Sequence, residues 1–317
     1  MSAPAIRAEG LGYRYRSAAA AAVDGISFTV APGEIFGLLG PNGAGKTTTV
    51  GMLATLLRPA TGRAWIAGCE VSEDPLGARR ALAAVLQETA VEPLLTVRDN
   101  LVLCGKLRGL SGAPLRAAVE KQIGALELEP HLDKVGQELS GGTRRRVQVA
   151  KALIVPTPVL FLDEATTGMD PLIKRRVIGM IRDAARDGRA ILLTTQLLDE
   201  AEALCDRLAL VRAGTIAAAG TLAELRARAR PLLRMTLAFA QSGPDAAAAL
   251  AGWPCEERVE SEGEWRLTVT GSENEWIARV AELAARHPLS RFELSGADLE
   301  QIFVEIYGGH SPTGVAS

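Results

Sequence analysis

The stretch Gly40-Pro41-Asn42-Gly43-Ala44-Gly45-Lys46-Thr47 decides the fold of this chain of 317 residues. It fits the pattern G-x-x-x-x-G-K-[ST], in which a glycine-rich loop turns its backbone N–H groups around a phosphate. The apolar run 35–39 before the loop predicts a buried strand, and residues 46–57 after it predict a helix, which is the context that the pattern requires. Lys46 would place its charge on the β- and γ-phosphate oxygens, and the Thr47 hydroxyl would bind Mg²⁺. We therefore expect a nucleoside triphosphate site.

A second stretch, Val159-Leu160-Phe161-Leu162-Asp163-Glu164, supplies the acids that such a loop needs. Its four apolar residues predict a buried strand, and the two acids follow at the carboxyl end, where ligands bind in open parallel sheets. We expect Asp163 to hold Mg²⁺, directly or through water, and Glu164 to polarise the attacking water as general base. Together the two stretches predict an NTPase.

A third stretch, Leu139-Ser140-Gly141-Gly142-Thr143, predicts a second anion site. Ser140 is a good N-cap, and Gly141 and Gly142 expose backbone donors at the start of a helix. If the helical segment around this site holds it away from the phosphate loop, a second protomer must supply it. The sequence thus predicts a head-to-tail pair with ATP between the two subunits.

The rest of the chain predicts an α/β core with two additions. The apolar run 190–193, and more weakly 85–86 and 208–211, alternate with helical patterns, which indicates βαβ units and a parallel sheet covered by helices. We expect a nucleotide-binding domain over 1–228, with a helical subdomain at about 88–156. Short strands and helices then predict a small α+β accessory domain over 229–307. Its last helix would carry Leu299, Ile302, Phe303 and Ile306, and 308–317 would form a flexible tail.

Composition excludes several other classes of protein. The net charge of −2 creates no overall field that would attract nucleic acid or anionic membrane. We expect Arg144, Arg145 and Arg146 to form a solvated helix face or a partner contact rather than a nucleic-acid site. The four cysteines are far apart, three histidines make a histidine-rich metal site improbable, and no run reaches the roughly 18 apolar residues of a membrane span. We expect a soluble, intracellular chain.

These motifs stand in the order found in the ATP-binding subunits of ABC transporters, which the chain resembles over residues 4–228. Residues 40–48 match Walker A, 139–143 the family signature, 159–164 Walker B and 169–170 the D-loop. The resemblance implies that Tyr15, rather than Tyr13, stacks on adenine and that Gln87 senses the γ-phosphate or Mg²⁺. The nucleotide-binding residues that it implies are Tyr15, Gly40, Pro41, Asn42, Gly43, Ala44, Gly45, Lys46, Thr47, Thr48, Gln87, Ser140, Gly141, Gly142, Asp163 and Asp170.

The implied metal ligands are Thr47, Gln87 and Asp163, and the implied catalytic residues are Glu164, Lys46 and Gln196. Two positions depart from the family pattern. Thr143 replaces the glutamine that ends the signature, which we expect to matter little because Ser140 and the glycine amides meet the phosphate. Gln196 replaces a histidine that clamps the γ-phosphate; it can donate an amide N–H but cannot become cationic.

The segments 85–90, 164–168 and 192–201 resemble the daunorubicin-resistance branch of this family, whose members often end in a helix like 298–303. This resemblance implies an exporter ATPase that dimerises on Mg-ATP. It would work at the cytoplasmic face of the membrane, with residues 87–110 contacting a separate permease and a drug, antibiotic or lipid-like cargo. The alternative is a soluble ATPase of the same superfamily acting on DNA or the ribosome. The chain has neither a sustained heptad run nor a second cassette, features typical of those proteins.

Overall fold

The computed structural model describes residues 3–87, 90–228, 232–240, 244–261, 263–295, 302–303 and 307. The chain divides into two compact units, Met1–Gly220 and Thr221–Ser317. The first unit contains every motif named above. The predicted division into domains over 1–228 and 229–307 stays a prediction.

A six-stranded sheet forms the centre of the first unit, in the order β10-β9-β3-β8-β7-β6. Its strands are β3 (Ile35–Leu39), β6 (Leu82–Val85), β7 (Val159–Asp163), β8 (Ala190–Thr195), β9 (Arg207–Arg212) and β10 (Thr215–Gly220). All neighbours pair in parallel except β9 and β10. Strands β3, β7 and β8 are buried along their whole length, as their continuous apolar runs predict. The predicted α/β class is confirmed.

An antiparallel sheet packs beside the first one, in the order β2-β1-β4-β5. It consists of β1 (Ile6–Tyr13), β2 (Val23–Val30), β4 (Thr61–Ile66) and β5 (Cys69–Glu70). Ile26, Phe28 and Val30 alternate with exposed residues and face the core. The ring of Phe28 stacks on that of Phe36 in β3, with centroids 5.0 Å apart, so one apolar core joins the two sheets.

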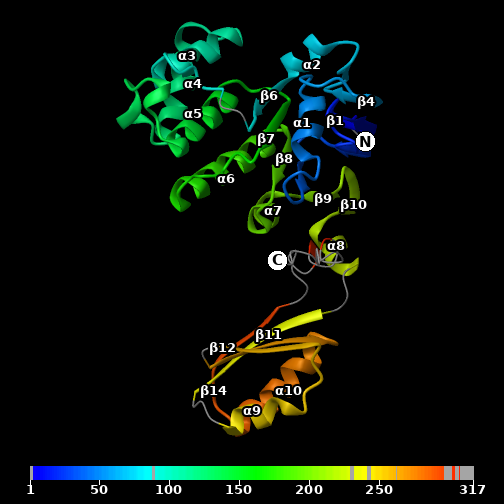
Figure 1. Ribbon diagram of the computed structural model, residues 1–317. Helices are drawn as coiled ribbons and strands as arrows, with labels where there is room; N and C mark the ends of the chain where they lie inside the picture. The colour runs from blue at the N-terminus through cyan, green and yellow to red at the C-terminus, as the bar shows by residue number, and fades with distance from the viewer. Residues whose placement is uncertain are drawn as a thin grey trace, which may run out of the picture. The chain divides into compact units, whose positions relative to one another are not determined.

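Helices flank these sheets in two groups (Figure 1). The first group is α1 (Lys46–Leu53), α2 (Pro75–Ala81), α6 (Pro171–Arg186) and α7 (Leu198–Leu204); the second is α3 (Val97–Leu107), α4 (Gly112–Ala125) and α5 (Gly141–Ile154), which lie together to one side. Helix α1 ends four residues before the predicted residue 57, because Thr55 adopts a left-handed φ of 61° and the N–H groups of Leu56 and Leu57 turn back to Gly51.

The second unit follows α8 (Leu222–Arg228) with the order β-α-β-β-α-β, a ferredoxin-like arrangement. Its elements are β11 (Leu232–Phe239), α9 (Pro244–Ala251), β12 (Glu257–Ser261), β13 (Glu264–Thr270), α10 (Glu273–Arg286) and β14 (Leu289–Ser295), and the sheet order is β12-β13-β11-β14. Trp276, Val280 and Leu283 of α10 pack into its core, as their spacing predicts. Ile302 and Phe303 are helical, whereas Leu299, Ile306 and the predicted tail 308–317 lie outside the described residues.

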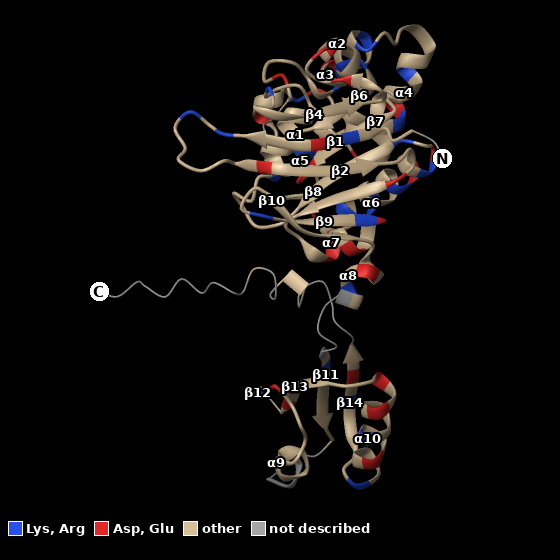
Figure 2. Cartoon of the chain, turned by 90° about the vertical axis from the view of Figure 1, so that its right-hand side faces the viewer, with Lys and Arg blue, Asp and Glu red and all other residues tan. Residues whose placement is uncertain are grey.

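Basic and acidic residues both occur along the elements of each unit (Figure 2), in keeping with the small net charge. Among the described residues, no helix combines the length and the apolar character that crossing a bilayer requires.

Strand β3, which leads into the phosphate loop, passes very close to the segment after α7. A Cβ atom placed on Gly37 would lie 2.6 Å from the Sγ atom of buried Cys205. We therefore expect Gly37→Ala to lower the free energy of unfolding by about 1–3 kcal/mol, measured by urea denaturation. Cys205→Ala empties that space, so in its background the cost of Gly37→Ala should largely vanish. An equal cost in both backgrounds would contradict this close approach.

Candidate functional site

The phosphate loop bends tightly before α1 and needs glycine where it does so. Gly45 caps the helix with a left-handed φ of 108°, and a Cβ there would lie 2.4 Å from the carbonyl oxygen of Ala22. Lys46 Nζ folds over the loop and donates to the carbonyl oxygens of Gly40 (2.7 Å) and Pro41 (3.0 Å). Burial lowers the pKa of Lys46, and the charges of Glu164 and Asp163 partly oppose this. The lysine is therefore held at the loop, close to both acids.

The carboxylate of Asp163 lies where β7 ends, beside the start of α1. Only 1% of this residue is exposed. Its Oδ1 atom accepts hydrogen bonds from the hydroxyl of Thr194 and, at 3.4 Å, from that of Thr47. Its Oδ2 atom is buried with no hydrogen-bond partner in the part of the chain that the structure describes. A buried, unpaired carboxylate oxygen next to a threonine hydroxyl fits Mg²⁺, which prefers oxygen ligands.

Glu164 is held by its backbone in an uncommon conformation. Its φ of 51° is left-handed, which costs a residue with a side chain of this size roughly 1–3 kcal/mol. Its N–H donates to the carbonyl oxygen of Thr194 (3.1 Å), and its own carbonyl oxygen accepts a hydrogen bond from Arg145 Nη2 (2.8 Å). Strain that the surroundings maintain in this way often marks a functional residue.

A hollow of about 360 Å³ brings Gln87 and Glu164 together with the signature glycines Gly141 and Gly142. Arg144, Arg145, Gln148, Thr167 and Gly168 complete its lining, and none of the described residues that line it belongs to the phosphate loop. The start of α5 packs directly on the loop at Gly168, because a Cβ on Gly142 would lie 2.8 Å from its carbonyl oxygen. The hollow thus groups three of the predicted motifs and is not lined by the phosphate loop, although Thr47 of the loop lies beside Asp163 at the end of β7.

Ser140 caps α5, as predicted, by accepting a hydrogen bond from the N–H of Thr143 (3.2 Å). The Thr143 hydroxyl, at the position where the family has glutamine, lies 2.9 Å from the Ser140 hydroxyl and accepts from Arg146 Nη2 (3.2 Å). Thr143 is buried, so this side chain supports the start of the helix from within the subunit.

Two other predicted residues lie beside the ends of elements in the first unit: Tyr15 follows β1, and Asp170 precedes α6. Tyr15 is partly exposed, its hydroxyl lies 3.2 Å from that of Thr48 in α1, and the ring of Tyr13 meets it edge-on at 4.9 Å. Asp170 caps α6, since its Oδ1 atom accepts the N–H groups of Leu172 and Ile173 at 3.1 Å each. Tyr15 thus borders the phosphate loop, and Asp170 fixes the start of a helix.

Gln196 is exposed and directly follows β8. The segment that carries it is anchored by Glu200, a residue that the sequence did not single out. Glu200 of α7 is only 2% exposed, and its carboxylate accepts hydrogen bonds from the hydroxyls of Thr195 (2.6 Å) and Thr166 (2.7 Å). It therefore ties the segment that carries Gln196 to the segment that follows Glu164. Asp199 and Glu202 beside it look equally acidic in sequence, so only the fold distinguishes Glu200.

The arginine run after the signature corrects another expectation. Arg145 is buried, with 9% of its surface exposed, so the prediction of a solvated helix face is wrong for this residue. Arg144 Nη2 donates to the carbonyl oxygen of Leu139, and Arg146 Nη1 donates to those of Leu126 and Glu127. Three consecutive helical residues point about 100° apart, so a continuous run of charge cannot all face solvent when the helix packs on a sheet.

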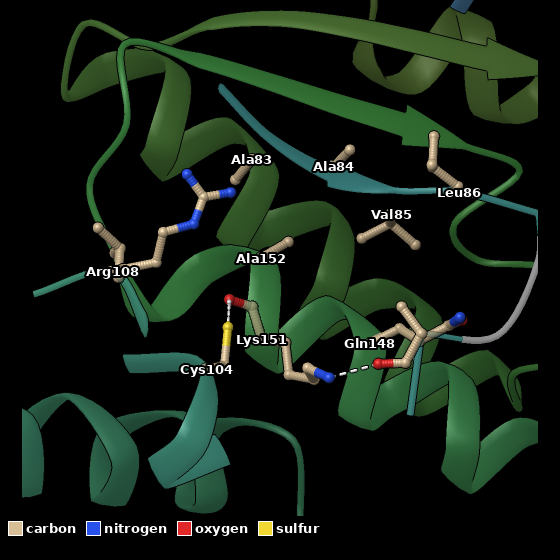
Figure 3. A pocket seen from close by; sticks show the side chains of 11 residues that line it. Ala83, Ala84, Val85, Leu86, Cys104, Arg108, Gln148, Lys151 and Ala152 are labelled. Atoms are coloured by element: carbon tan, nitrogen blue, oxygen red, sulfur yellow. Dashed lines mark hydrogen bonds between the residues drawn. The ribbon is translucent and has the colours of Figure 1, made fainter. Parts of the chain in front are cut away.

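A second, smaller cavity of about 100 Å³ lies between β6 and the helices α3 and α5, just before Gln87 (Figure 3). Cys104, Arg108 and Lys151 line it opposite the strand. Cys104 Sγ donates to the carbonyl oxygen of Lys151 (3.5 Å), and burial raises the pKa of this thiol. Nearby in the chain, Leu94 and Leu107 are 77% and 78% exposed.

Comparisons with known proteins agree with these motifs. The family described as ABC transporter matches residues 23–167. A daunorubicin/doxorubicin resistance ATP-binding protein of Streptomyces peucetius is 37% identical over 90% of this chain and 88% of its own length. A Nod factor export ATP-binding protein I of Paraburkholderia xenovorans is 38% identical over 90% of this chain and 92% of its own length.

Among solved structures, the ATP binding subunit of an ABC transporter superposes with a TM-score of 0.66 at 28% identity. The superposition covers 70% of this chain and 92% of that structure. The predicted resemblance to the daunorubicin-resistance branch is confirmed by the similarity to that Streptomyces protein. The chain belongs to the ABC transporter family, as one of its ATP-binding subunits and an ATPase.

Proposed function

We propose that two copies of this chain pair head to tail on Mg-ATP and use ATP hydrolysis to drive export through a separate membrane permease, at the cytoplasmic face. One observation carries the pairing. The signature glycines open on a hollow that contains no described residue of the phosphate loop, so one chain does not surround a nucleotide with both motifs. A second copy, turned head to tail, would present its signature to the exposed side of the loop.

In this proposal the loop N–H groups and Lys46 bind the phosphates, and Tyr15 stacks on the adenine. Lys46 would replace its hydrogen bonds to the carbonyl oxygens of Gly40 and Pro41 with bonds to phosphate oxygens. The negative charge of the phosphates would then stabilise the buried ammonium group. Thr47, Asp163 and Gln87 would hold Mg²⁺, which when bound offsets the negative charge on the phosphates. The unpaired Oδ2 atom of Asp163 supports this ligand set.

Glu164 would take a proton from the attacking water as the water oxygen bonds to the γ-phosphorus. The bond from the γ-phosphorus to the bridging oxygen then breaks, leaving ADP and inorganic phosphate. Gln196 would donate its amide N–H to the γ-phosphate. Ser140 and the N–H groups of Gly141 and Gly142 would meet the partner's nucleotide, and Asp170 would help by fixing the start of α6 at the pairing surface.

Export is supported by the relatives, one named as a drug-resistance protein and another as an export protein. The segment 87–110 is the proposed contact with the permease. It carries the exposed leucines Leu94, Leu103 and Leu107. Leu103 and Leu107 lie one turn apart on α3, and exposed apolar side chains on one helix face are typical of a surface that a partner covers. The cargo would be a drug, an antibiotic or a lipid-like molecule.

Replacement of the proposed base should separate binding from hydrolysis. We expect Glu164→Gln to lower kcat at least about 100-fold, because a carboxamide cannot take the proton from water. ATP should then persist between the subunits, so ATP-dependent dimers should accumulate in light scattering. Glu120→Gln removes an exposed acid that pairs with Arg98, and we expect it to behave like the wild type. Turnover of Glu164→Gln within twofold of the wild type would exclude the proposed base.

The proposed clamp can be tested at Gln196. A hydrogen bond to a charged phosphate contributes about 1.5–3 kcal/mol, so Gln196→Ala should lower kcat by about 10- to 100-fold with a smaller change in KM. Steady-state phosphate release measures both constants. Gln196→His, which introduces the family's usual residue, should keep at least wild-type turnover near neutral pH. Wild-type kcat in Gln196→Ala would show that this side chain has no clamp role.

A permease should accompany the tagged chain through affinity purification from its native cells in mild detergent. We expect mass spectrometry to find one polytopic membrane protein in near-equal amount, and Leu107→Asp to reduce its recovery at least about tenfold by placing a charge in an apolar contact. Ile277→Asp, at an exposed position of the second unit, is the matched control. Recovery of ribosomes or DNA-associated proteins, with no membrane protein, would favour the soluble alternative.

A further inference from the structure

We propose that Arg145 is a positioning residue for ATP hydrolysis, which aims Glu164 and Gln87 by holding the backbone next to them and couples both to the signature helix. The inference rests on the roles proposed above for Glu164, Gln87 and the signature. It assigns a function to a side chain that the family motifs do not include.

The guanidinium of Arg145 joins three segments that are distant in sequence. Nη1 donates to the carbonyl oxygen of Leu86 (2.7 Å) and to Oε1 of Gln148 (2.9 Å). Nη2 donates to the carbonyl oxygens of Asp163 and of Glu164 (2.8 Å). Leu86 directly precedes Gln87. One side chain thus binds the backbone of Glu164, the proposed base, and the backbone beside Gln87, the proposed γ-phosphate sensor.

Only arginine provides this set of bonds. Its planar guanidinium has N–H groups that point in fixed directions, whereas a lysine ammonium is a single point with three rotatable donors. Burial lowers the pKa of Arg145, and the nearby Asp163 and Glu164 charges act in the opposite direction. A buried cation is tolerated when hydrogen-bond acceptors pair with its N–H groups. Here Arg145 donates to four acceptors. The site is built around a charged, correctly oriented guanidinium.

The bond to Glu164 matters because that residue is strained. Its peptide is fixed on one side by the N–H bond to Thr194 and on the other by the carbonyl bond to Arg145. Without the second bond the left-handed φ of 51° has less to maintain it, and the carboxylate would leave its place. A displacement of about 1 Å in a catalytic group can cost about 100-fold in rate.

The position of Arg145 on α5 adds a connection between the two nucleotides of a dimer. It lies one turn after Gly141, at the helix start that is proposed to meet the partner's ATP. When α5 shifts on meeting that ATP, its arginine pulls on the carbonyls of Leu86, Asp163 and Glu164 in its own subunit. Arg145 therefore links closure at one ATP site to alignment of Glu164 at the other, which predicts positive cooperativity in ATP.

The test compares Arg145→Lys with Arg258→Lys in the full-length chain. Arg258 also donates to backbone carbonyls, those of Leu250 and Trp253, but it belongs to the second unit and to none of the motifs. Steady-state assays over a range of ATP give kcat, KM and the Hill coefficient. Titration with Mg-ADP, which is not hydrolysed, gives nucleotide affinity, and thermal unfolding gives Tm.

We expect Arg145→Lys to lower kcat by about 10- to 100-fold while KM and Mg-ADP affinity stay within about threefold. The Hill coefficient should fall toward 1, and Arg258→Lys should match the wild type in kcat. Wild-type kcat in Arg145→Lys would overturn the proposal. So would an equal loss in Arg258→Lys, or a loss of nucleotide affinity and Tm in proportion to kcat, because these results indicate a merely structural role.

Arg145→Gln provides a second variant if the lysine variant does not fold. It removes the buried charge, keeps two N–H donors and should show the same separation of kcat from affinity. Glu164→Gln in the same assay distinguishes the two levels of inference. If Glu164→Gln hydrolyses ATP normally, the proposed base itself is wrong. If Glu164→Gln is inactive and both Arg145 variants are normal, only the positioning role is wrong.

Discussion

The buried carboxylate of Asp163 is the constraint around which the nucleotide-binding part of the chain is arranged. It lies at the carboxyl edge of β7 and accepts hydroxyl hydrogen bonds from Thr194 in β8 and Thr47 in α1. These bonds fix the end of one strand, the end of its neighbour and the start of the phosphate-loop helix relative to one another. Burying a carboxylate with one oxygen unpaired costs stability. A magnesium ion with its nucleotide would offset that cost, so the same group that orders the site favours its ligand.

Helix α5 serves the neighbouring part of the site by using different faces for different tasks. Its first turn carries the signature glycines, its buried Arg145 binds the backbone beside Gln87 and the two acids, and Arg146 ties it to the end of the α4 segment. Gly142 packs closely on the carbonyl of Gly168, so the start of α5 contacts the loop that follows Glu164. In the proposed dimer, a partner that meets the first turn of α5 would therefore act on the segments around Glu164.

Sequence predicted the parts of this arrangement that depend on local physics. The phosphate loop, the strand ending at Asp163 and the cap formed by Ser140 follow from neighbours within a few residues. Arg145 and Glu200 could not be found in that way, because each is one of several like charges in a row and only packing selects which is buried. The end of α1 depends on the left-handed φ of Thr55, and threonine has no preference for that conformation from which it could be predicted. The roles assigned to the individual site residues, Gln196 among them, stay predictions.

The replacement of histidine by Gln196 gives these hidden residues more weight. A cationic donor attracts the γ-phosphate from several directions, because Coulomb energy falls only slowly with distance. A neutral amide contributes through a hydrogen bond that weakens steeply when its angle is poor. The proposed amide clamp must therefore be held accurately. Glu200 anchors the adjacent Thr195 by accepting hydrogen bonds from its hydroxyl and from that of Thr166. In the proposed mechanism Arg145 fixes Glu164 from the other side, so hydrolysis depends on buried positioning groups rather than on a cationic clamp.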